Sequence, residues 1–249
     1  MVLSIRQVLT DAASSRPDKI WLVAPETEKS FSWQETHHRA ETIACYLQGA
    51  GISTGASVAI AAPNGAAASF AFLGVVYGGL RATPLNLLAG VKTLAFVLRH
   101  SKTELILCAD DSRALVDEAI ATLIEKGEHP PRIISMDVDD GPRWAETGII
   151  PVKPTDLREP STNTIGLLMY TSGTTGVPKG VLLSHANLIA AGTNVAVAHK
   201  LTPADTSMCV LPIYHINGLC VTVMGSLVSS GGLVIPRRFS ARHFWAQMH

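Results

Sequence analysis

The chain has 249 residues, a formal net charge of zero, and 16% charged residues against 47% hydrophobic residues. This composition predicts a large buried core and argues against a disordered chain, in which charges outweigh apolar residues. The balanced charge gives no support for a surface that binds nucleic acid.

Residues 1–136 alternate between helix-like and strand-like segments. Apolar spacing, a capping box formed by Ser32 and Glu35, and glycine stops predict helices at residues 5–14, from 32 to about 49, from 65 to about 78, at 91–100 and at 113–125. Apolar and β-branched runs predict strands at residues 20–23, 29–33, 57–61, 104–108 and 133–136. This alternation indicates an α/β fold with mostly parallel, doubly wound sheets flanked by helices. Such folds bind ligands beyond the carboxyl ends of their strands.

Residues 137–160 are rich in Asp, Pro and Gly and show little periodicity. We interpret them as a connection, which divides the chain into subdomains 1–160 and 161–249. The acidic run Asp137–Asp140 is expected to form a solvated turn rather than a cation site. Beyond it, a helix is predicted to start at Ser184 as N-cap, and a strand is predicted near Met208–Leu211.

No Asp, Glu, Lys or Arg occurs between Asp205 and Arg237. The stretch is long enough to span a membrane, which takes about 20 mainly apolar residues. Because it contains Pro212, Asn217 and four glycines, we interpret it as buried core instead. The N-terminus lacks a basic segment followed by an apolar one, so no signal peptide is expected.

The four cysteines form no C-x-x-C pair and no zinc-type spacing with histidine: Cys45, Cys108, Cys209 and Cys220. We therefore expect buried thiols without disulfides, which fits a reducing, cytoplasmic location.

The segment Tyr170–Val181 has the sequence Y-T-S-G-T-T-G-V-P-K-G-V and lies between two strand-like runs. Its three glycines let backbone N–H groups approach an anion, its hydroxyls add donors, and Lys179 adds a positive charge. It differs from the common P-loop, because Pro178 stands where that pattern has Gly and no hydroxyl follows the lysine. We interpret it as a cradle for polyphosphate, exposed and poorly ordered without nucleotide, rather than as a plain surface loop.

This segment resembles the phosphate-binding signature of the adenylate-forming enzymes: acyl-CoA synthetases, luciferases and adenylation domains of peptide synthetases. Leu211–Leu219, with the sequence L-P-I-Y-H-I-N-G-L, is similar to the family segment that lines the carboxylate-substrate pocket. His185 and Asn187 match the family's S-H-x-N segment, for which a structural role is expected. Softer similarity extends from about Arg6 to Met248.

The resemblance implies the N-terminal portion of a large adenylation domain, from an AMP-forming acid–thiol ligase of the acyl-CoA synthetase type. A small-molecule carboxylic acid would react with ATP, in the presence of Mg²⁺, to give an acyl-adenylate and pyrophosphate. The thiol of coenzyme A, or of a pantetheine arm, would then displace AMP. Three alternatives stay open: an adenylation domain that loads a carrier protein, an unrelated phosphate-binding NTPase, and a non-enzymatic binding module.

The resemblance also assigns roles to residues. The ATP phosphates would be bound by Thr171, Ser172, Gly173, Thr174, Thr175, Gly176 and Lys179. Lys179 and His215 would be catalytic, and His215, Asn217 and Gly218 would line the substrate pocket. From the residues alone, Lys179 could equally be a surface lysine and His215 a core histidine. No metal ligand is predicted, and the acid is not determined, although Phe239–Trp245 resembles the corresponding stretch of carnitine and crotonobetaine CoA ligases.

Ser240 is predicted to cap a helix that carries Phe244, Trp245 and Met248 and that meets no stop signal before His249. Members of the family continue beyond this point and carry a C-terminal lid with a catalytic lysine. We therefore expect a fragment that lacks the lid domain, is inactive alone and self-associates through exposed core surface.

Overall fold

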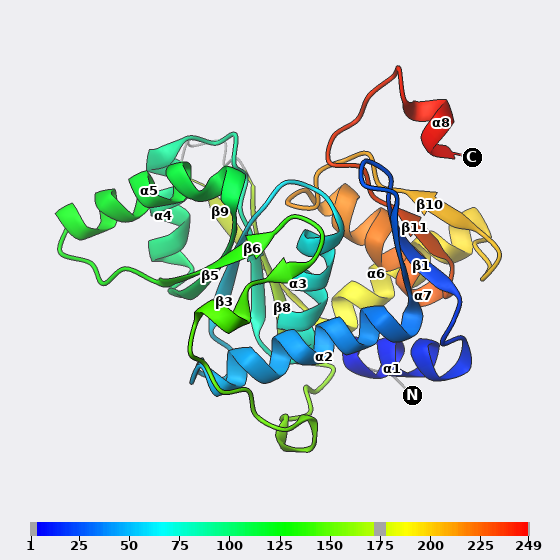
Figure 1. Ribbon diagram of the computed structural model, residues 1–249, viewed down its shortest axis with the longest axis horizontal. Helices are drawn as coiled ribbons and strands as arrows, with labels where there is room; N and C mark the ends of the chain where they lie inside the picture. The colour runs from blue at the N-terminus through cyan, green and yellow to red at the C-terminus, as the bar shows by residue number, and fades with distance from the viewer. Residues whose placement is uncertain (1–3, 172–177, 249) are drawn as a thin grey trace.

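The computed structural model describes residues 4–171 and 178–248 (Figure 1). Among these residues, seven strands form one sheet in the order β7-β6-β5-β3-β4-β8-β9, and four form a second sheet in the order β10-β11-β1-β2. The strands are β1 (Ile20–Ala24), β2 (Lys29–Ser32), β3 (Ser57–Ala61), β4 (Arg81–Pro84), β5 (Thr103–Ala109), β6 (Arg132–Asp137), β7 (Gly141–Pro142), β8 (Ile165–Thr171), β9 (Lys179–Ser184), β10 (Thr206–Met208) and β11 (Gly232–Val234). The helices are α1 (Ile5–Ser15), α2 (Trp33–Gly49), α3 (Ala66–Tyr77), α4 (Val91–His100), α5 (Arg113–Glu125), α6 (His185–His199), a π-helical segment (Asn217–Val223), α7 (Met224–Ser229) and α8 (Phe244–Met248).

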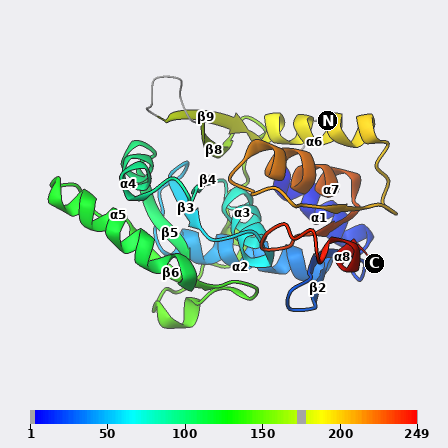
Figure 2. The same ribbon diagram turned by 90° about the horizontal axis from the view of Figure 1, so that it is seen from above.

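The seven-stranded sheet is parallel except at its two edges. Strands β6, β5, β3, β4 and β8 run parallel, whereas β7 and β9 are antiparallel to their neighbours. Helices α4 and α5 cover one face of this sheet, and α2 and α3 lie on the other (Figures 1 and 2). This arrangement confirms the predicted α/β fold, with a mostly parallel sheet flanked by helices.

Helix α3 forms the centre of the core, because all 12 of its residues are buried and none carries a charge. It lies between the two sheets and contacts strands of both (Figure 1). Helix α2 approaches it closely at Gly74, where an added Cβ would lie 2.5 Å from the Cβ of Ile43. A larger residue at position 74 would therefore push the two helices apart.

Neither sheet is built from one continuous stretch of chain. Strand β1 pairs in parallel with β11, with Leu22 opposite Leu233, although more than 200 residues separate them in sequence. Strands β8 and β9, in turn, extend the sheet that β3 begins. Each sheet therefore takes strands from both sides of residue 160, so subdomains 1–160 and 161–249 divide the sequence rather than the sheets.

Helix starts follow the local sequence more closely than strand ends do. Ser32 and Ser184 cap α2 and α6, as predicted, and Ser4 caps α1 in the same way. The strand predicted near Met208–Leu211 has wrong bounds, because β10 ends at Met208. The N–H of Cys209 still donates to Val234 of β11, but Leu211 and Ile213 bond to the side chain of Asn64. Ser240 does not cap α8, which begins at Phe244; its hydroxyl pairs with the ring of His243.

The acidic run at residues 137–140 forms the predicted turn, but the turn is only partly solvated, because its carboxylates bond within it and to distant residues. The carboxylate of Asp137 accepts the N–H groups of Asp139 and Asp140. Asp140 pairs with Lys29 of β2 at 3.0 Å, and Asp139, which is 5% exposed, lies 3.6 Å from the guanidinium of Arg237. The turn therefore connects the seven-stranded sheet to β2 of the second sheet and to the segment that follows β11.

The charge-free stretch between Asp205 and Arg237 contributes to the core, as predicted. Leu219, Val223, Leu227 and Leu233 are fully buried in the main hydrophobic cluster. Within the described residues, none of the helices combines the length and apolar character that a membrane crossing requires.

Candidate functional site

The β8–β9 hairpin presents both ends of the predicted phosphate cradle. Thr171 and Lys179 form its last cross-strand pair, and both residues are exposed. Because β8 runs parallel to β4, the loop end of the hairpin lies at the carboxyl edge of the sheet, where α/β folds bind ligands. The strands predicted on the two sides of the loop are confirmed as β8 and β9. The predicted exposure and disorder of the loop lie outside the described residues, as do Ser172, Gly173, Thr174, Thr175 and Gly176.

Tyr170 braces the hairpin immediately before Thr171. Its hydroxyl is hydrogen-bonded to Nδ1 of His100, at the end of α4, at 2.8 Å. Its ring lies over Gly180, where an added Cβ would stand 3.4 Å from the ring and 2.9 Å from the side chain of Leu168. Gly180 was expected to help the loop bend, but it belongs to β9 opposite Tyr170, and its missing side chain makes room for the brace.

The Leu211–Leu219 segment is a tight turn that leads into a helix. The N–H of His215 donates to the carbonyl of Pro212 at 3.0 Å. Gly218 allows the turn to close, because an added Cβ would lie only 2.4 Å from the same carbonyl oxygen. His215 and Asn217 are exposed, whereas Gly218 is buried.

The helical run begins at Asn217, and its first part is wound as a π-helix. The predicted roles of His215, Asn217 and Gly218 toward a substrate stay predictions.

One cavity brings the two motifs together. Its volume is about 250 Å³, and its lining includes Thr171 and Pro178 from the ends of the cradle, Tyr214 from the turn and Asn86 from the loop after β4. The other predicted site residues of the described chain lie outside this lining: Lys179, His215, Asn217 and Gly218. The cavity thus contacts the cradle ends directly and the histidine turn through Tyr214.

Sequence reasoning missed Asn64 and Asn86. Asn64 follows β3 and bonds the backbone of the histidine turn on both sides of Pro212. Asn86 follows β4 and lines the cavity. Both stand just beyond the carboxyl end of a parallel strand, which is where ligand-site residues of such folds gather. That position was the available signal, but nothing in the local sequence says what either side chain contacts.

His185 is a structural histidine, as expected. It is fully buried at the start of α6, and its Nδ1 accepts the N–H of Ile5 at 3.0 Å. The ring is therefore neutral, with its proton on Nε2, and Nε2 has no hydrogen-bond partner among the described residues. Burial, together with the nearby guanidinium of Arg6, lowers the pKa of His185 to about 4.

The cysteines do not contribute a nucleophile. All four are free and buried, as predicted. Burial raises the pKa of the thiols of Cys108, Cys209 and Cys220 to about 11 and also raises that of Cys45. Thiols held protonated at neutral pH are poor nucleophiles. Over the described parts of the chain, no group of three or more His, Cys, Asp or Glu side chains is placed to hold a metal ion.

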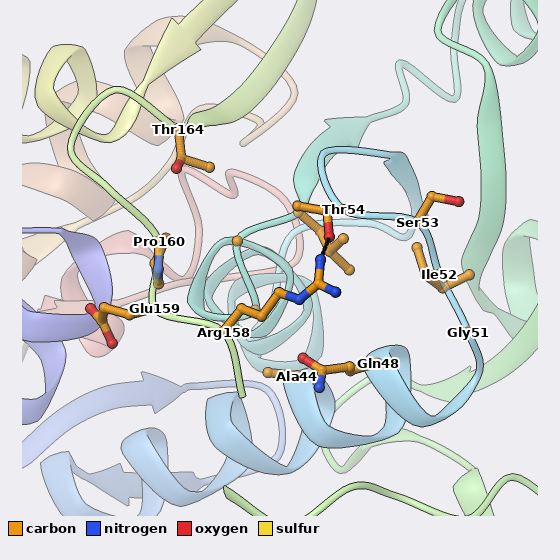
Figure 3. A pocket seen from close by; sticks show the side chains of 13 residues that line it. Ala44, Gln48, Gly51, Ile52, Ser53, Thr54, Arg158, Glu159, Pro160 and Thr164 are labelled. Atoms are coloured by element: carbon orange, nitrogen blue, oxygen red, sulfur yellow. Dashed lines mark hydrogen bonds between the residues drawn. The ribbon is translucent and has the colours of Figure 1, made fainter. Parts of the chain in front are cut away.

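A larger cavity, of about 410 Å³, lies at the opposite edge of the sheet (Figure 3). It is bordered by Thr54, Leu80 and Thr164, which precede the amino ends of β3, β4 and β8. The guanidinium of Arg158 lies within it and donates to the hydroxyl of Thr54 (Figure 3). The C-terminal ends of α2 and α3 also face this cavity, and their partial negative charge disfavours an anionic ligand.

The chain is similar in sequence to known proteins. The family model of AMP-binding enzymes matches residues 9–249. The chain is 39% identical over 236 residues to the sulfoacetate–CoA ligase of Cupriavidus necator, covering 94% of this chain and 45% of that protein. It is 31% identical over 210 residues to the oxalate–CoA ligase of Arabidopsis thaliana, covering 80% of this chain and 39% of that protein.

The fold has solved counterparts. The crystal structure of ATP-bound MatB from Rhodopseudomonas palustris superposes with a TM-score of 0.84 at 22% identity, over 100% of this chain and 48% of that chain. The present chain thus spans less than half the length of these three proteins.

Proposed function

Because the chain belongs to the family of AMP-binding enzymes, we propose that the protein carrying it is an ATP-dependent acid–thiol ligase of the acyl-CoA synthetase type. A carboxylate oxygen attacks the α-phosphorus of ATP, pyrophosphate leaves, and an acyl-adenylate forms. A thiol then attacks the acyl carbon and AMP leaves. The thiol is that of coenzyme A, with a carrier-protein pantetheine arm as the alternative.

The observation that supports this proposal best is the shared cavity at the carboxyl edge of the sheet. The two ends of a hydroxyl-rich loop and the neighbour of an exposed histidine contact the same space. The first step brings an anion against a polyanion, so it needs positive charge and hydrogen-bond donors held in place. Thr171 and Lys179 offer a hydroxyl and an ammonium group at the loop end of the hairpin. The hydrogen bond between Tyr170 and His100 braces this end.

We propose that Lys179 and the loop before it hold the β- and γ-phosphates, and that His215 contacts the carboxylate or the α-phosphate. Asn217 and Gly218 open the helix behind His215. Mg²⁺ enters the proposal as the ion that accompanies ATP, and no described residue is assigned to it. The residues that complete the adenine, metal and thiol sites belong to the rest of the full-length protein, so the 249-residue piece alone is inactive.

Two further properties belong to the proposal. The four protonated, unpaired thiols fit a reducing compartment such as the cytoplasm. The edge strand β9 exposes Val181 by 44% and Leu182 by 51%, and Leu211 is 47% exposed. We propose that the isolated piece self-associates through these apolar side chains.

Replacement of Lys179 by alanine in the full-length protein is expected to raise the half-saturating ATP concentration about tenfold. A hydrogen bond to a charged group contributes about 1.5–3 kcal/mol, and each 1.4 kcal/mol corresponds to a factor of about ten in affinity. Half-saturation by the acid should change less than about threefold. The measurement is steady-state pyrophosphate release with each substrate varied in turn.

The matched control is Lys126→Ala, which removes an exposed lysine just after α5. It should leave both half-saturation values unchanged. Equal ATP dependence in the wild type and in Lys179→Ala would remove Lys179 from the phosphate site.

The choice of assay separates the proposal from its alternatives. An unrelated NTPase releases phosphate or pyrophosphate without any acid, and a binding module turns over neither substrate. An acid panel should include sulfoacetate and oxalate, the acids in the names of two relatives. Coenzyme A and a pantetheine-loaded carrier protein, compared as acceptors, separate the two kinds of thiol.

A further inference from the structure

The side chain of Asn64 is bonded on both sides to the backbone of the histidine turn. Its Nδ2 donates to the carbonyl of Leu211 at 2.9 Å, and its Oδ1 accepts the N–H of Ile213 at 2.9 Å. The residue is 8% exposed. A carboxamide that donates one hydrogen bond and accepts another bonds the backbone in the way that a neighbouring β-strand does. The turn is therefore held as a strand would be, but by a single side chain.

The backbone that carries Asn64 is itself fixed. Gly65 adopts φ 146°, a conformation that side chains other than hydrogen disfavour. The N–H of Ala67, in the first turn of α3, donates to the carbonyl of Val138 at 3.2 Å, and the hydroxyl of Ser69 donates to the carbonyl of Gly65 at 3.1 Å. Val138 lies within the acidic run, in which Asp140 pairs with Lys29 and Asp139 pairs with Arg237. Asn64 therefore projects from a turn that these hydrogen bonds and the conformation of Gly65 hold in place.

On the other side of the contact, the histidine turn is anchored by the buried side chain of Ile213 and by a small number of hydrogen bonds among the described residues. Among the residues that the structure describes, the carbonyl of Leu211 accepts one further hydrogen bond besides that of Asn64, from the weak thiol donor of Cys209 at 3.4 Å. The N–H of His215 is bonded within the turn, to the carbonyl of Pro212. His215 is exposed and has only Tyr214 as a described aromatic neighbour, at 4.9 Å between ring centroids. The carbonyl of His215 accepts the N–H of Leu219 at 3.1 Å, so the position of the His215 ring depends on the helical run after it and on the backbone of residues 211–213 before it.

We propose that Asn64 is a positioning residue, which sets the place of His215 by fixing the backbone of Leu211 and Ile213. Through it, the β3–α3 turn and the acidic run behind it are coupled to the acid-binding side of the site. The kinetic consequence rests on the proposed function. The coupling between Asn64 and the turn is measurable without any activity.

The first test is amide hydrogen exchange in the full-length protein. Asn64→Ala should speed exchange of the Ile213 amide about tenfold or more, because that N–H loses its acceptor. Amides of β3 and β5 should exchange at the wild-type rate. The matched control is Asn194→Ala, which removes an exposed asparagine of α6 and should change neither set. Unchanged exchange at Ile213, or equal acceleration throughout the core, would overturn the proposal.

The second test is kinetic. Asn64→Ala should raise the KM for the acid about tenfold and leave the KM for ATP within about twofold, since the phosphate cradle is anchored on β8 and β9 instead. A variant that only lowered stability would reduce kcat and leave this ratio alone. An unchanged acid KM, despite faster exchange at Ile213, would overturn the positioning of His215. If the wild type shows no acid-dependent turnover, the proposed function fails, and the exchange data alone still decide whether Asn64 holds the turn.

Discussion

Replacement of His215 by alanine in the full-length protein is expected to lower acid-dependent pyrophosphate exchange about 100-fold. The turn leaves this ring exposed beside the cavity, while its backbone is fixed by Pro212 and, two residues before it, by Asn64. A donor held in this way stabilises charge that develops on the carboxylate or the α-phosphate. Removal of one such donor typically costs about 10²–10³ in rate.

Two variants test whether the loss comes from that donor. His215→Gln keeps an N–H group near the same place and should recover part of the rate. His199→Ala removes an exposed histidine at the end of α6 and should leave the rate unchanged. An exchange rate within about threefold of the wild type in His215→Ala would exclude His215 from the reaction.

Acid should weaken the fold through His185. The folded protein holds this ring neutral, because Nδ1 already accepts the N–H of Ile5 and burial lowers its pKa to about 4. In the unfolded chain the ring takes up a proton near its ordinary pKa of about 6.5. The unfolded state therefore binds more protons, and the free energy of unfolding falls as the pH drops below about 6.5. Since one pKa unit corresponds to about 1.36 kcal/mol, the full loss near pH 4 is about 3 kcal/mol.

Urea unfolding at pH 7.5 and pH 5.0 measures this effect before most carboxylates titrate. Over that interval the wild type should lose about 2 kcal/mol more than His185→Gln, since about 1.5 pH units lie below the ordinary pKa of about 6.5. The glutamine keeps an acceptor for Ile5 but has no titratable ring. His37, whose pKa burial also lowers, contributes equally to both proteins. Equal pH dependence in the two proteins would show that His185 does not carry this loss.

Local signals in the sequence predicted local structure well. The capping box at Ser32 and the N-cap at Ser184 correctly predicted where α2 and α6 begin, because each cap satisfies backbone donors within a few residues. The helix expected from residue 65 to about 78 corresponds to α3, at residues 66–77. Parallel strands separated by helices were enough to indicate the α/β fold.

Contacts between distant segments could not be predicted in the same way. The pairing of β1 with β11 depends on side-chain packing across the core, and no local pattern encodes it. The acidic run was expected to be solvated because its partners, Lys29 and Arg237, lie far away in sequence. Gly180 shows the same limit. A glycine beside a loop suggests a bend in the backbone, and only the structure shows that the ring of Tyr170 packs against it.

The candidate site shows the same difference between local sequence signals and contacts of distant segments. The resemblance located the hairpin and the histidine turn, and the structure places both at the carboxyl edge of the sheets and joins them at one cavity. Asn64 escaped notice because its role consists entirely of contacts with residues about 150 positions later: Leu211 and Ile213. A Pro-Asn-Gly sequence by itself predicts only a turn.

The most direct test of the central claim is the exchange of labelled pyrophosphate into ATP by the full-length protein. The assay is run with ATP and Mg²⁺, without any thiol, against a panel of carboxylic acids that includes sulfoacetate and oxalate. If the protein forms an acyl-adenylate, label should enter ATP with at least one acid, at background rate without acid, and far more slowly in His215→Ala. Exchange or hydrolysis that ignores the acid, or no exchange with any acid by a protein that binds ATP, would contradict the account.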